Sequence, residues 1–171
     1  TFRDFYVEIL ESNGIFIPVV NPALENRLVQ ETVDTALYEG ELGHYAAIAQ
    51  KPGFILALQD AFAELRGAYV NPEDFLEYAR SSSKARYELA ILYDQFLTRL
   101  NQINWIDIEG QSWLAIDVLK NNPQALSESM HVFVDGFTSF SGVRREFLKG
   151  ISTQVEGITI TLPGEENSLR M

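Results

Sequence analysis

The stretch from His131 to Phe140 constrains the fold of this chain more than any other. Its first residues are apolar and end at one carboxylate, Asp135, followed by glycine, a pattern typical of a short strand that ends in a tight turn. The segment 141–150 is helix-like, with Ser141 as its N-cap, and a second apolar run covers 157–162. Strand, helix and strand within roughly thirty residues predict a βαβ unit with parallel strands. Because ligands bind at the carboxyl ends of parallel strands, Asp135 is a candidate site residue.

The residues before this unit are predicted to form about six helices. Apolar side chains recur at helical spacing from Phe2 to Leu10 and from Leu89 to Leu100, and an asparagine N-cap precedes proline at Pro22 and at Pro72. The helices are expected at residues 1–11, 22–40, 54–67, 72–80, 84–101 and 111–120, with an extended connector at 15–20 and no assignment for 43–49.

The predicted fold class is therefore mainly α with a small parallel β element. We place a domain boundary between a helical body, residues 1–125, and a βαβ portion, residues 126–171. A lone βαβ unit offers too little sheet to be stable by itself. We therefore expect this chain to be a fragment of a larger α/β protein.

The composition narrows the function classes. A net charge of −11 argues against a dedicated nucleic-acid-binding domain, although it leaves room for contacts made by a small basic patch. The absence of cysteine excludes disulfides and thiolate sites. No apolar run approaches the roughly 18–20 residues that cross a bilayer, so we expect a cytoplasmic protein with no membrane partner.

The acidic residues and histidines allow both a chemical and a structural interpretation. Asp135 has the position to hold Mg²⁺, or it caps the loop that follows. Asp107 and Glu109 would need a third partner to bind a metal or act as a base; N-capping by Asp107 or solvent exposure is the alternative. His44 and His131 do not have the spacing of zinc ligands and are predicted to be structural or surface residues.

Two basic clusters are candidates for contacts with phosphate groups, and a solvated surface is the alternative for both. The first surrounds a run of three serines, and the second lies on the helix of the βαβ unit. The clusters are Arg80, Lys84 and Arg86, and Arg144, Arg145 and Lys149.

Five short motifs follow one another in an order found in a known family. The order resembles the first RecA-like P-loop domain of a superfamily 1 helicase of the UvrD/Rep type, interrupted by its helical insertion. More narrowly, it resembles the AddB (RexB) component of the AddAB (RexAB) helicase–nucleases, which are ATP-dependent enzymes of double-strand-break repair. The motifs are Thr-Phe-Arg-Asp-Phe at 1–5, Pro-Gly-Phe-Ile-Leu-Ala-Leu at 52–58, Glu-Leu-Arg-Gly-Ala at 64–68, Trp-Ile-Asp-Ile-Glu at 105–109 and Val-Phe-Val-Asp-Gly-Phe at 132–137.

The last motif departs from the pattern of active helicases, which carry V-D-E-x-Q-D at the Walker B position. Here Gly136 replaces the glutamate that positions the attacking water, so the site lacks its water-orienting carboxylate. The resemblance thus implies an inactivated helicase domain in which Asp135 and Gly136 are a vestigial Walker B motif. We expect no catalytic residue and no cofactor in this fragment, and ATP and Mg²⁺ are the candidate cofactors of the parent complex.

The resemblance further implies a function: a non-hydrolysing, helicase-like part of a repair hydrolase that scaffolds the complex and guides single-stranded DNA. Its partners would be an AddA-like helicase–nuclease subunit and single-stranded DNA, bound weakly by the isolated piece. The alternative is a helical protein-interaction module with no nucleic-acid role, marked by a large exposed apolar patch. The residues expected to contact DNA are Thr1, Phe2, Arg80, Lys84 and Arg86.

Overall fold

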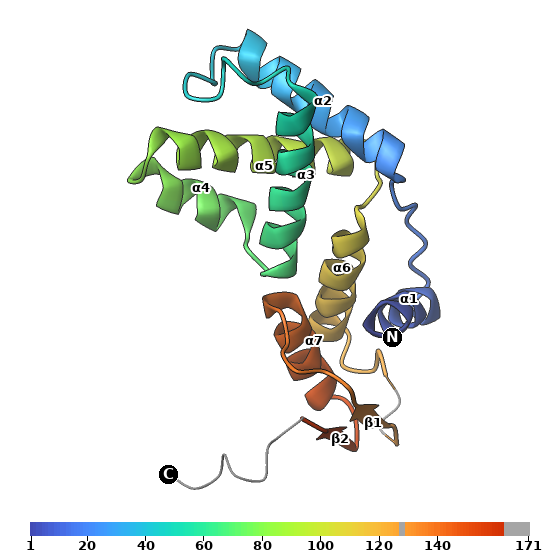
Figure 1. Ribbon diagram of the computed structural model, residues 1–171. Helices are drawn as coiled ribbons and strands as arrows, with labels where there is room; N and C mark the ends of the chain where they lie inside the picture. The colour runs from blue at the N-terminus through green and yellow to red at the C-terminus, as the bar shows by residue number, and fades with distance from the viewer. Residues whose placement is uncertain (127–128, 163–171) are drawn as a thin grey trace, which may run out of the picture. The chain divides into compact units, whose positions relative to one another are not determined.

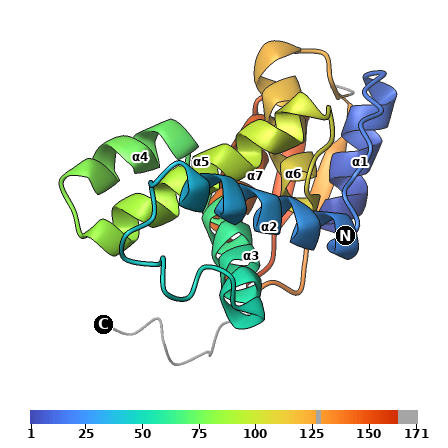
Figure 2. The same ribbon diagram turned by 90° about the horizontal axis from the view of Figure 1, so that it is seen from above.

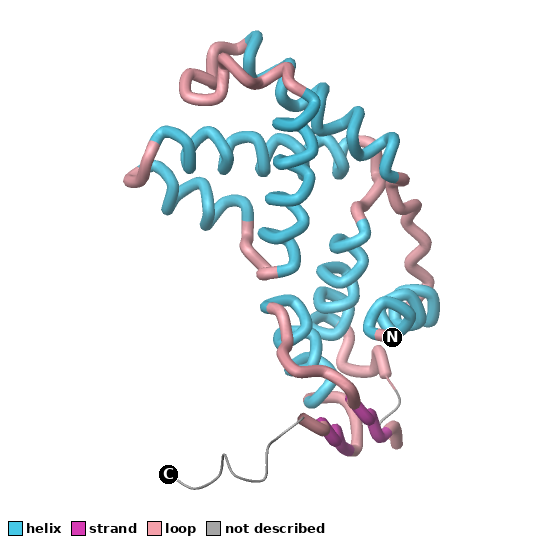
Figure 3. Tube along the Cα trace, viewed as in Figure 1, coloured by secondary structure: helices cyan, strands magenta, loops and turns pink. Residues whose placement is uncertain are grey.

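The computed structural model describes residues 1–126 and 129–162. Within them the chain forms seven α-helices and one pair of short parallel strands, which confirms the predicted fold class (Figure 1). Figure 3 shows how small the strand pair is beside the helices. The helices are α1 (Phe2–Ser12), α2 (Pro22–Tyr38), α3 (Pro52–Gly67), α4 (Pro72–Arg80), α5 (Lys84–Gln102), α6 (Ile108–Asn121) and α7 (Gly142–Ser152); the strands are β1 (His131–Val134) and β2 (Gly157–Ile160).

The helix starts follow the predicted capping signals. The side chain of Asn21 accepts a hydrogen bond from the backbone of Leu24 at 2.9 Å, and Asn71 accepts one from Glu73 at 2.8 Å, each ahead of a proline in the first turn. Two starts differ from the prediction by more than one residue. The α3 helix begins at Pro52, two residues earlier than expected. The α6 helix begins at Ile108, three residues earlier than expected, because the side chain of Asp107 caps it.

Packing divides the chain into two compact units, which are described separately. Unit 1 comprises residues 1–15 and 112–171, and unit 2 comprises residues 16–111. The division does not fall at the predicted boundary between residues 125 and 126, and that domain assignment stays a prediction. The α6 helix begins in unit 2 and continues in unit 1.

Unit 2 is a helical body built around α5. This helix packs against α2 and α4, and α2 packs against α3 (Figures 1 and 2). The ring of Phe62 on α3 stacks on that of Phe96 on α5 with centroids 5.1 Å apart, and both side chains are 2% exposed or less. Phe62 also contacts Tyr93, whose hydroxyl donates to the carbonyl of Val70 at 3.0 Å. Burial of these rings stabilises the packing of α3 against α5.

The segment 43–49, which has no sequence assignment, is held by one carboxylate of α5. Glu88 is 5% exposed and accepts hydrogen bonds from three consecutive backbone N–H groups at 2.9, 2.7 and 2.9 Å. Burial by itself would raise the pKa of Glu88, but the three donors outweigh it and lower the pKa below its ordinary value. Backbone groups without helix or strand partners are thus satisfied by a buried charge. The donors are Gly43, His44 and Tyr45.

Unit 1 contains the predicted βαβ element, which is confirmed. The strands β1 and β2 pair in parallel with His131 opposite Gly157 and Val134 opposite Ile160, and α7 connects them. His131 is structural, as expected: its Nε2 lies 3.0 Å from the hydroxyl of Thr159. A Cβ at position 157 would lie 2.8 Å from the ring of the exposed His131 side chain, so a larger residue there would require this ring to move.

The core of unit 1 is aromatic and joins its two chain segments. Phe147 of α7 is fully buried, and its ring lies 4.5 Å from that of Tyr6 and 5.6 Å from that of Phe5, both on α1. The edge-to-face arrangement of these rings is the favoured geometry of aromatic pairs. The first helix of the chain therefore completes the core of the βαβ element.

No helix in the described part of the chain is both long and apolar enough to cross a membrane.

Substitution of Phe147 is expected to destabilise unit 1. Phe147→Ala removes a fully buried ring and should lower the free energy of unfolding by about 3–5 kcal/mol. The measurement is urea denaturation followed by the fluorescence of Trp113, which lies in unit 1, in a Trp105→Phe background. Phe133→Ala is the matched control because Phe133 is 75% exposed, and an equal loss in the control would contradict the packing described.

The hydrogen bonds of Glu88 predict that the free energy of unfolding of unit 2 depends on pH. A carboxyl whose pKa is lowered by folding stabilises the protein above its unfolded pKa of about 4.5, and this stabilisation is lost as the pH falls through the folded pKa. Glu88→Gln should therefore lower the free energy of unfolding at pH 7 by about 1.5–3 kcal/mol, and its deficit against the wild type should shrink below about pH 4.5. The readout is urea denaturation by Trp105 fluorescence in a Trp113→Phe background, between pH 7 and pH 3. Glu77→Gln, at an exposed position of α4, should show neither effect.

Candidate functional site

The residues singled out from the sequence fall into two groups, one in each unit. In unit 1 the structure brings several of them around one cavity of about 460 Å³ at the carboxyl end of β1. The basic cluster at the turn between α4 and α5 belongs to unit 2. The unit 1 group is Thr1, Phe2, Asp135 and Gly136; the unit 2 group is Arg80, Lys84 and Arg86.

The cavity in unit 1 has apolar walls and few polar groups. Its lining includes Thr1 and Phe2 at the start of α1 and Asp135, which directly follows β1. The other walls come from β1, α1 and α7. Apart from Thr1 and Asp135, every lining residue is apolar: Phe2, Phe5, Val132, Phe133, Val134, Phe137, Leu148 and Ile151.

Asp135 is exposed, and its carboxylate accepts a hydrogen bond from the hydroxyl of Thr161. Thr161 also donates its backbone N–H to the carbonyl of Val134 at 2.9 Å, so the segments after the two strands are tied together. Among the described residues no group of three metal-ligating side chains is present, at Asp135 or elsewhere. What this geometry shows for Asp135 is a role in holding the end of the sheet.

Gly136 adopts a backbone conformation that suits glycine. Its φ angle is +82°, in the left-handed region that residues with a Cβ rarely enter. A glutamate here would cost of order 1 kcal/mol in backbone strain, although no atom lies within 4 Å of the added Cβ. The turn after β1 therefore has a shape that favours the residue it carries over the glutamate of active helicases.

Thr1 and Phe2, the expected DNA contacts, both have structural partners. The Thr1 hydroxyl accepts the backbone N–H of Asp4 at 3.3 Å, and the backbone nitrogen of Thr1 donates to the Asp4 carboxylate at 2.9 Å, forming a capping box at the start of α1. The ring of Phe2 lies 5.1 Å from that of Phe137, and the guanidinium of Arg144 lies 5.3 Å from the Phe2 ring. Contacts of Thr1 and Phe2 with DNA stay a prediction.

The basic cluster on α7 is occupied by contacts within unit 1. Arg144 lies over the rings of Phe2 and Phe137, Arg145 donates to the carbonyl of Phe140 at 2.6 Å, and Lys149 pairs with Glu146 at 2.6 Å. The partners of Arg144 and Arg145 are neutral and only Lys149 pairs with a carboxylate, so phosphate binding by this cluster stays a prediction.

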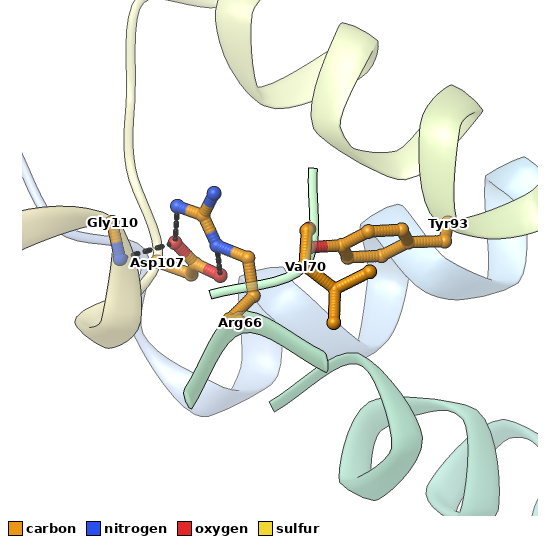
Figure 4. Close-up of polar contacts among 5 residues, drawn as sticks. All are labelled: Arg66, Val70, Tyr93, Asp107 and Gly110. Atoms are coloured by element: carbon orange, nitrogen blue, oxygen red, sulfur yellow. Dashed lines mark hydrogen bonds and ion pairs between the residues drawn. The ribbon is translucent and has the colours of Figure 1, made fainter. Parts of the chain in front are cut away.

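A buried ion pair between Arg66 and Asp107 lies in unit 2, and the sequence analysis missed it. The guanidinium of Arg66 donates to both carboxylate oxygens of Asp107 at 3.1 and 2.9 Å, and the residues are 8% and 3% exposed (Figure 4). Asp107 also accepts the backbone N–H of Gly110 at 2.7 Å, which caps α6. Of the two structural alternatives for Asp107, N-capping is confirmed and solvent exposure is wrong, because the side chain is buried against Arg66.

Gly110 is required by this ion pair. A Cβ at position 110 would lie 2.6 Å from the Asp107 carboxylate and 2.8 Å from the Arg66 guanidinium. Any other residue would therefore displace one partner of a buried charge pair. Figure 4 shows Asp107 between Arg66 and the backbone of Gly110.

Two ionisable side chains near the Arg66–Asp107 pair, Glu25 and Tyr93, have raised pKa values. Burial, and secondarily the negative charges of Asp107 and Glu109, raises the pKa of Glu25 on α2 above its ordinary value. Burial raises the pKa of Tyr93 to about 12. Both groups are therefore harder to ionise than in water.

One sequence signal could have indicated a buried arginine. Arg66 follows Leu58 and Phe62 at intervals of four residues, so it lies on the buried face of α3. A buried arginine needs a carboxylate partner, but the spacing on α3 gives no information about a partner 41 residues away.

By its fold the protein belongs to the class of mainly helical chains with a small parallel βαβ element, here with a first strand that ends in an Asp-Gly turn. The model of the family described as "ADDB, N-terminal" matches residues 28–171, and the chain belongs to this family. The predicted resemblance to AddB-type proteins is thereby confirmed.

Curated relatives are named as the B-type subunit of an ATP-dependent helicase/deoxyribonuclease. The protein of that name from Clostridium botulinum (strain Loch Maree / Type A3) is 25% identical over 157 residues, covering 89% of this chain and 13% of the relative. The Alkaliphilus metalliredigens (strain QYMF) protein is 24% identical over 164 residues, 92% of this chain and 14% of the relative. The Exiguobacterium sibiricum protein is 29% identical over 129 residues, 73% of this chain and 11% of the relative. The chain thus spans about an eighth of the length of these relatives.

Removing the charge of Asp107 tests the ion pair. Asp107→Asn keeps an oxygen that can accept from Gly110 but leaves the Arg66 guanidinium buried without its counter-charge. The free energy of unfolding should fall by about 3–5 kcal/mol, measured by urea denaturation through Trp105 fluorescence in a Trp113→Phe background. The matched control is Asp60→Asn, at an exposed position of α3, with an expected change within about 0.5 kcal/mol.

A double variant separates the ion pair from general damage to the site. Arg66→Met together with Asp107→Asn removes the unpaired charge and should recover part of the loss. A double variant that is as unstable as the sum of the two single variants would show that the two side chains act independently.

Proposed function

We propose that this chain is the N-terminal, helicase-like part of an AddB-type component of an ATP-dependent helicase/deoxyribonuclease. In this proposal it scaffolds a complex with an AddA-like helicase–nuclease subunit and guides single-stranded DNA during double-strand-break repair, while the partner hydrolyses ATP. The protein would be cytoplasmic. Membership of the "ADDB, N-terminal" family is the observation that carries the proposal, and it favours this function over the helical protein-interaction module.

The turn after β1 supports the non-hydrolysing part of the proposal. ATP hydrolysis in helicases needs a carboxylate that orients the attacking water, and that position is Gly136 in a left-handed conformation. The neighbouring Asp135 is bound to Thr161. A magnesium ion would have one carboxylate here, and magnesium sites of this kind depend on the phosphates of a nucleotide as well. Any ATP and Mg²⁺ would then serve the parent complex elsewhere.

The charge distribution supports a DNA role of modest affinity for this part of the protein. A chain with a net charge of −11 repels phosphates at long range, so contacts must come from local cations. Thr1 and Phe2 in unit 1, and Arg80, Lys84 and Arg86 in unit 2, are the proposed contacts. DNA bound in this way would be held strongly only by the complete complex.

One experiment on the full-length protein with its partner tests both parts of the proposal. We expect the complex to bind a single-stranded oligonucleotide with an affinity that falls as salt rises, measured by fluorescence anisotropy. We also expect Asp135→Asn to leave DNA-dependent ATP hydrolysis unchanged, because this domain does not carry out the reaction. A partner subunit unable to hydrolyse ATP is the positive control for loss of activity.

Two results would overturn the proposal. A large loss of ATP hydrolysis in Asp135→Asn, with the complex still intact, would show that this domain is catalytic. Absence of any single-stranded DNA binding by the complex would remove the DNA-guiding role.

A further inference from the structure

The turn between α4 and α5 concentrates positive charge in an acidic protein. Residues 78–87, here called the basic turn, contain three cations, two tyrosines and no acidic residue, whereas the whole chain carries 24 acidic and 13 basic residues. Figures 1 and 2 show the turn at the end of the α4–α5 pair. Its charged and aromatic members are Tyr78, Arg80, Lys84, Arg86 and Tyr87.

The three cations of the basic turn are exposed and not neutralised. Within residues 1–126 and 129–162, neither Arg80, Lys84 nor Arg86 forms an ion pair with a carboxylate. Three cations outside the turn do pair with acids among the described residues: Arg27 with Glu31 at 2.8 Å, Arg66 with Asp107, and Lys149 with Glu146. Positive charge at the basic turn is therefore available to an external anion.

Within the basic turn, the side chain of Arg86 is held by neutral partners. The guanidinium of Arg86 lies 5.6 Å from the centre of the Tyr78 ring and donates to the hydroxyl of Ser82 at 2.5 Å. The Ser83 hydroxyl accepts the backbone N–H of Arg86 at 3.3 Å. These contacts fix Arg86 beside an aromatic ring without cancelling its charge, which lowers the conformational entropy lost on binding.

Both tyrosines have ring surface open to solvent. Tyr78 is 61% exposed and Tyr87 is 38% exposed. Here three unneutralised cations lie between two exposed aromatic rings. Cations beside exposed rings are the combination that binds single-stranded nucleic acid: the cations contact phosphates and the rings stack on unpaired bases. A duplex offers the phosphates but keeps its bases stacked, and an acidic peptide offers no bases.

We infer that the basic turn is a single-stranded DNA contact in which Tyr78 and Tyr87 stack on bases while Arg80, Lys84 and Arg86 bind the backbone. The inference rests on the proposed function and assigns to that function a stacking surface on α4 and α5. It predicts binding with no base-sequence preference, because every base has a face on which a ring can stack.

The test uses the full-length protein with its partner and two oligonucleotides of equal length, one of thymidines and one with abasic sites throughout. The triple variant Arg80→Gln, Lys84→Gln, Arg86→Gln should bind both oligonucleotides more weakly and lower the slope of log affinity against log salt by about 2, since each phosphate contact on a single strand contributes roughly 0.7. The double variant Tyr78→Ala, Tyr87→Ala should bind the thymidine oligonucleotide roughly fivefold to a hundredfold more weakly, with the salt slope and abasic binding unchanged.

Matched controls come from the same unit. Tyr38→Ala removes a tyrosine that is 92% exposed but has Asp34, Glu39 and Glu41 as sequence neighbours, and Lys51→Gln removes an exposed cation outside the turn. Neither control should change the affinity or the salt slope. Circular dichroism of each variant checks that the helices remain folded.

The outcomes separate this inference from the proposed function. If the wild-type complex binds the oligonucleotide and both sets of variants bind as tightly as the controls, the basic turn is not a DNA contact while the proposed function stands. If only the cation variant loses affinity, the stacking assignment is overturned. If the wild-type complex binds no single-stranded DNA, the proposed function fails and the inference fails with it.

Discussion

The buried charge pair of Arg66 and Asp107 is the constraint on which the arrangement of unit 2 depends. Two charges that are 8% and 3% exposed must face each other, because either alone would be an unpaired charge in a dry interior. The same carboxylate caps α6, so one side chain fixes both the end of α3 and the start of α6. Such a pair adds little net stability over a well-packed apolar pair. It nevertheless restricts how α3 and the start of α6 can pack, because any packing that separates the two side chains leaves a buried charge unpaired. Gly110, which has no room for a Cβ, extends this constraint to the backbone.

Local sequence signals were sufficient to predict where most of the helices lie. Asparagine before proline, helical spacing of apolar side chains and the serine run each act within a few residues, so the starts of α2, α4 and α5 could be predicted. The start of α6 was predicted three residues late, because N-capping by Asp107 was one of several alternatives for a residue in an alternating segment. The path of residues 43–49 could not be predicted, because its backbone partner is Glu88, more than forty residues away. Contacts between residues so far apart in sequence form only when the chain folds, so a local sequence pattern does not show them.

The candidate site shows the same division between local and long-range information. The turn after β1 was predicted from two adjacent residues, Asp135 and Gly136, and the structure shows Gly136 there in a left-handed conformation. That Thr1 and Phe2 would share a cavity with Asp135 depends on the packing of α1 against α7, through rings more than 130 residues apart in sequence. Residue order and the match over residues 28–171 gave the family, but neither could show that Phe2 is surrounded by other rings.

The discontinuity of unit 1 has a consequence for synthesis of the protein. The buried face of α1, formed by Tyr6, Ile9 and Leu10, packs in a unit whose other residues begin at Ser112. At ribosomal rates of about 5–20 residues per second, the intervening residues 16–111 take roughly 5 to 20 seconds to emerge. Helix pairs fold in far less time, so unit 2 can be complete while α1 still waits for α7 with its apolar face uncovered. The nascent chain therefore has a period in which the apolar face of α1 is exposed to solvent, and this is the interval in which a chaperone that recognises apolar segments would act.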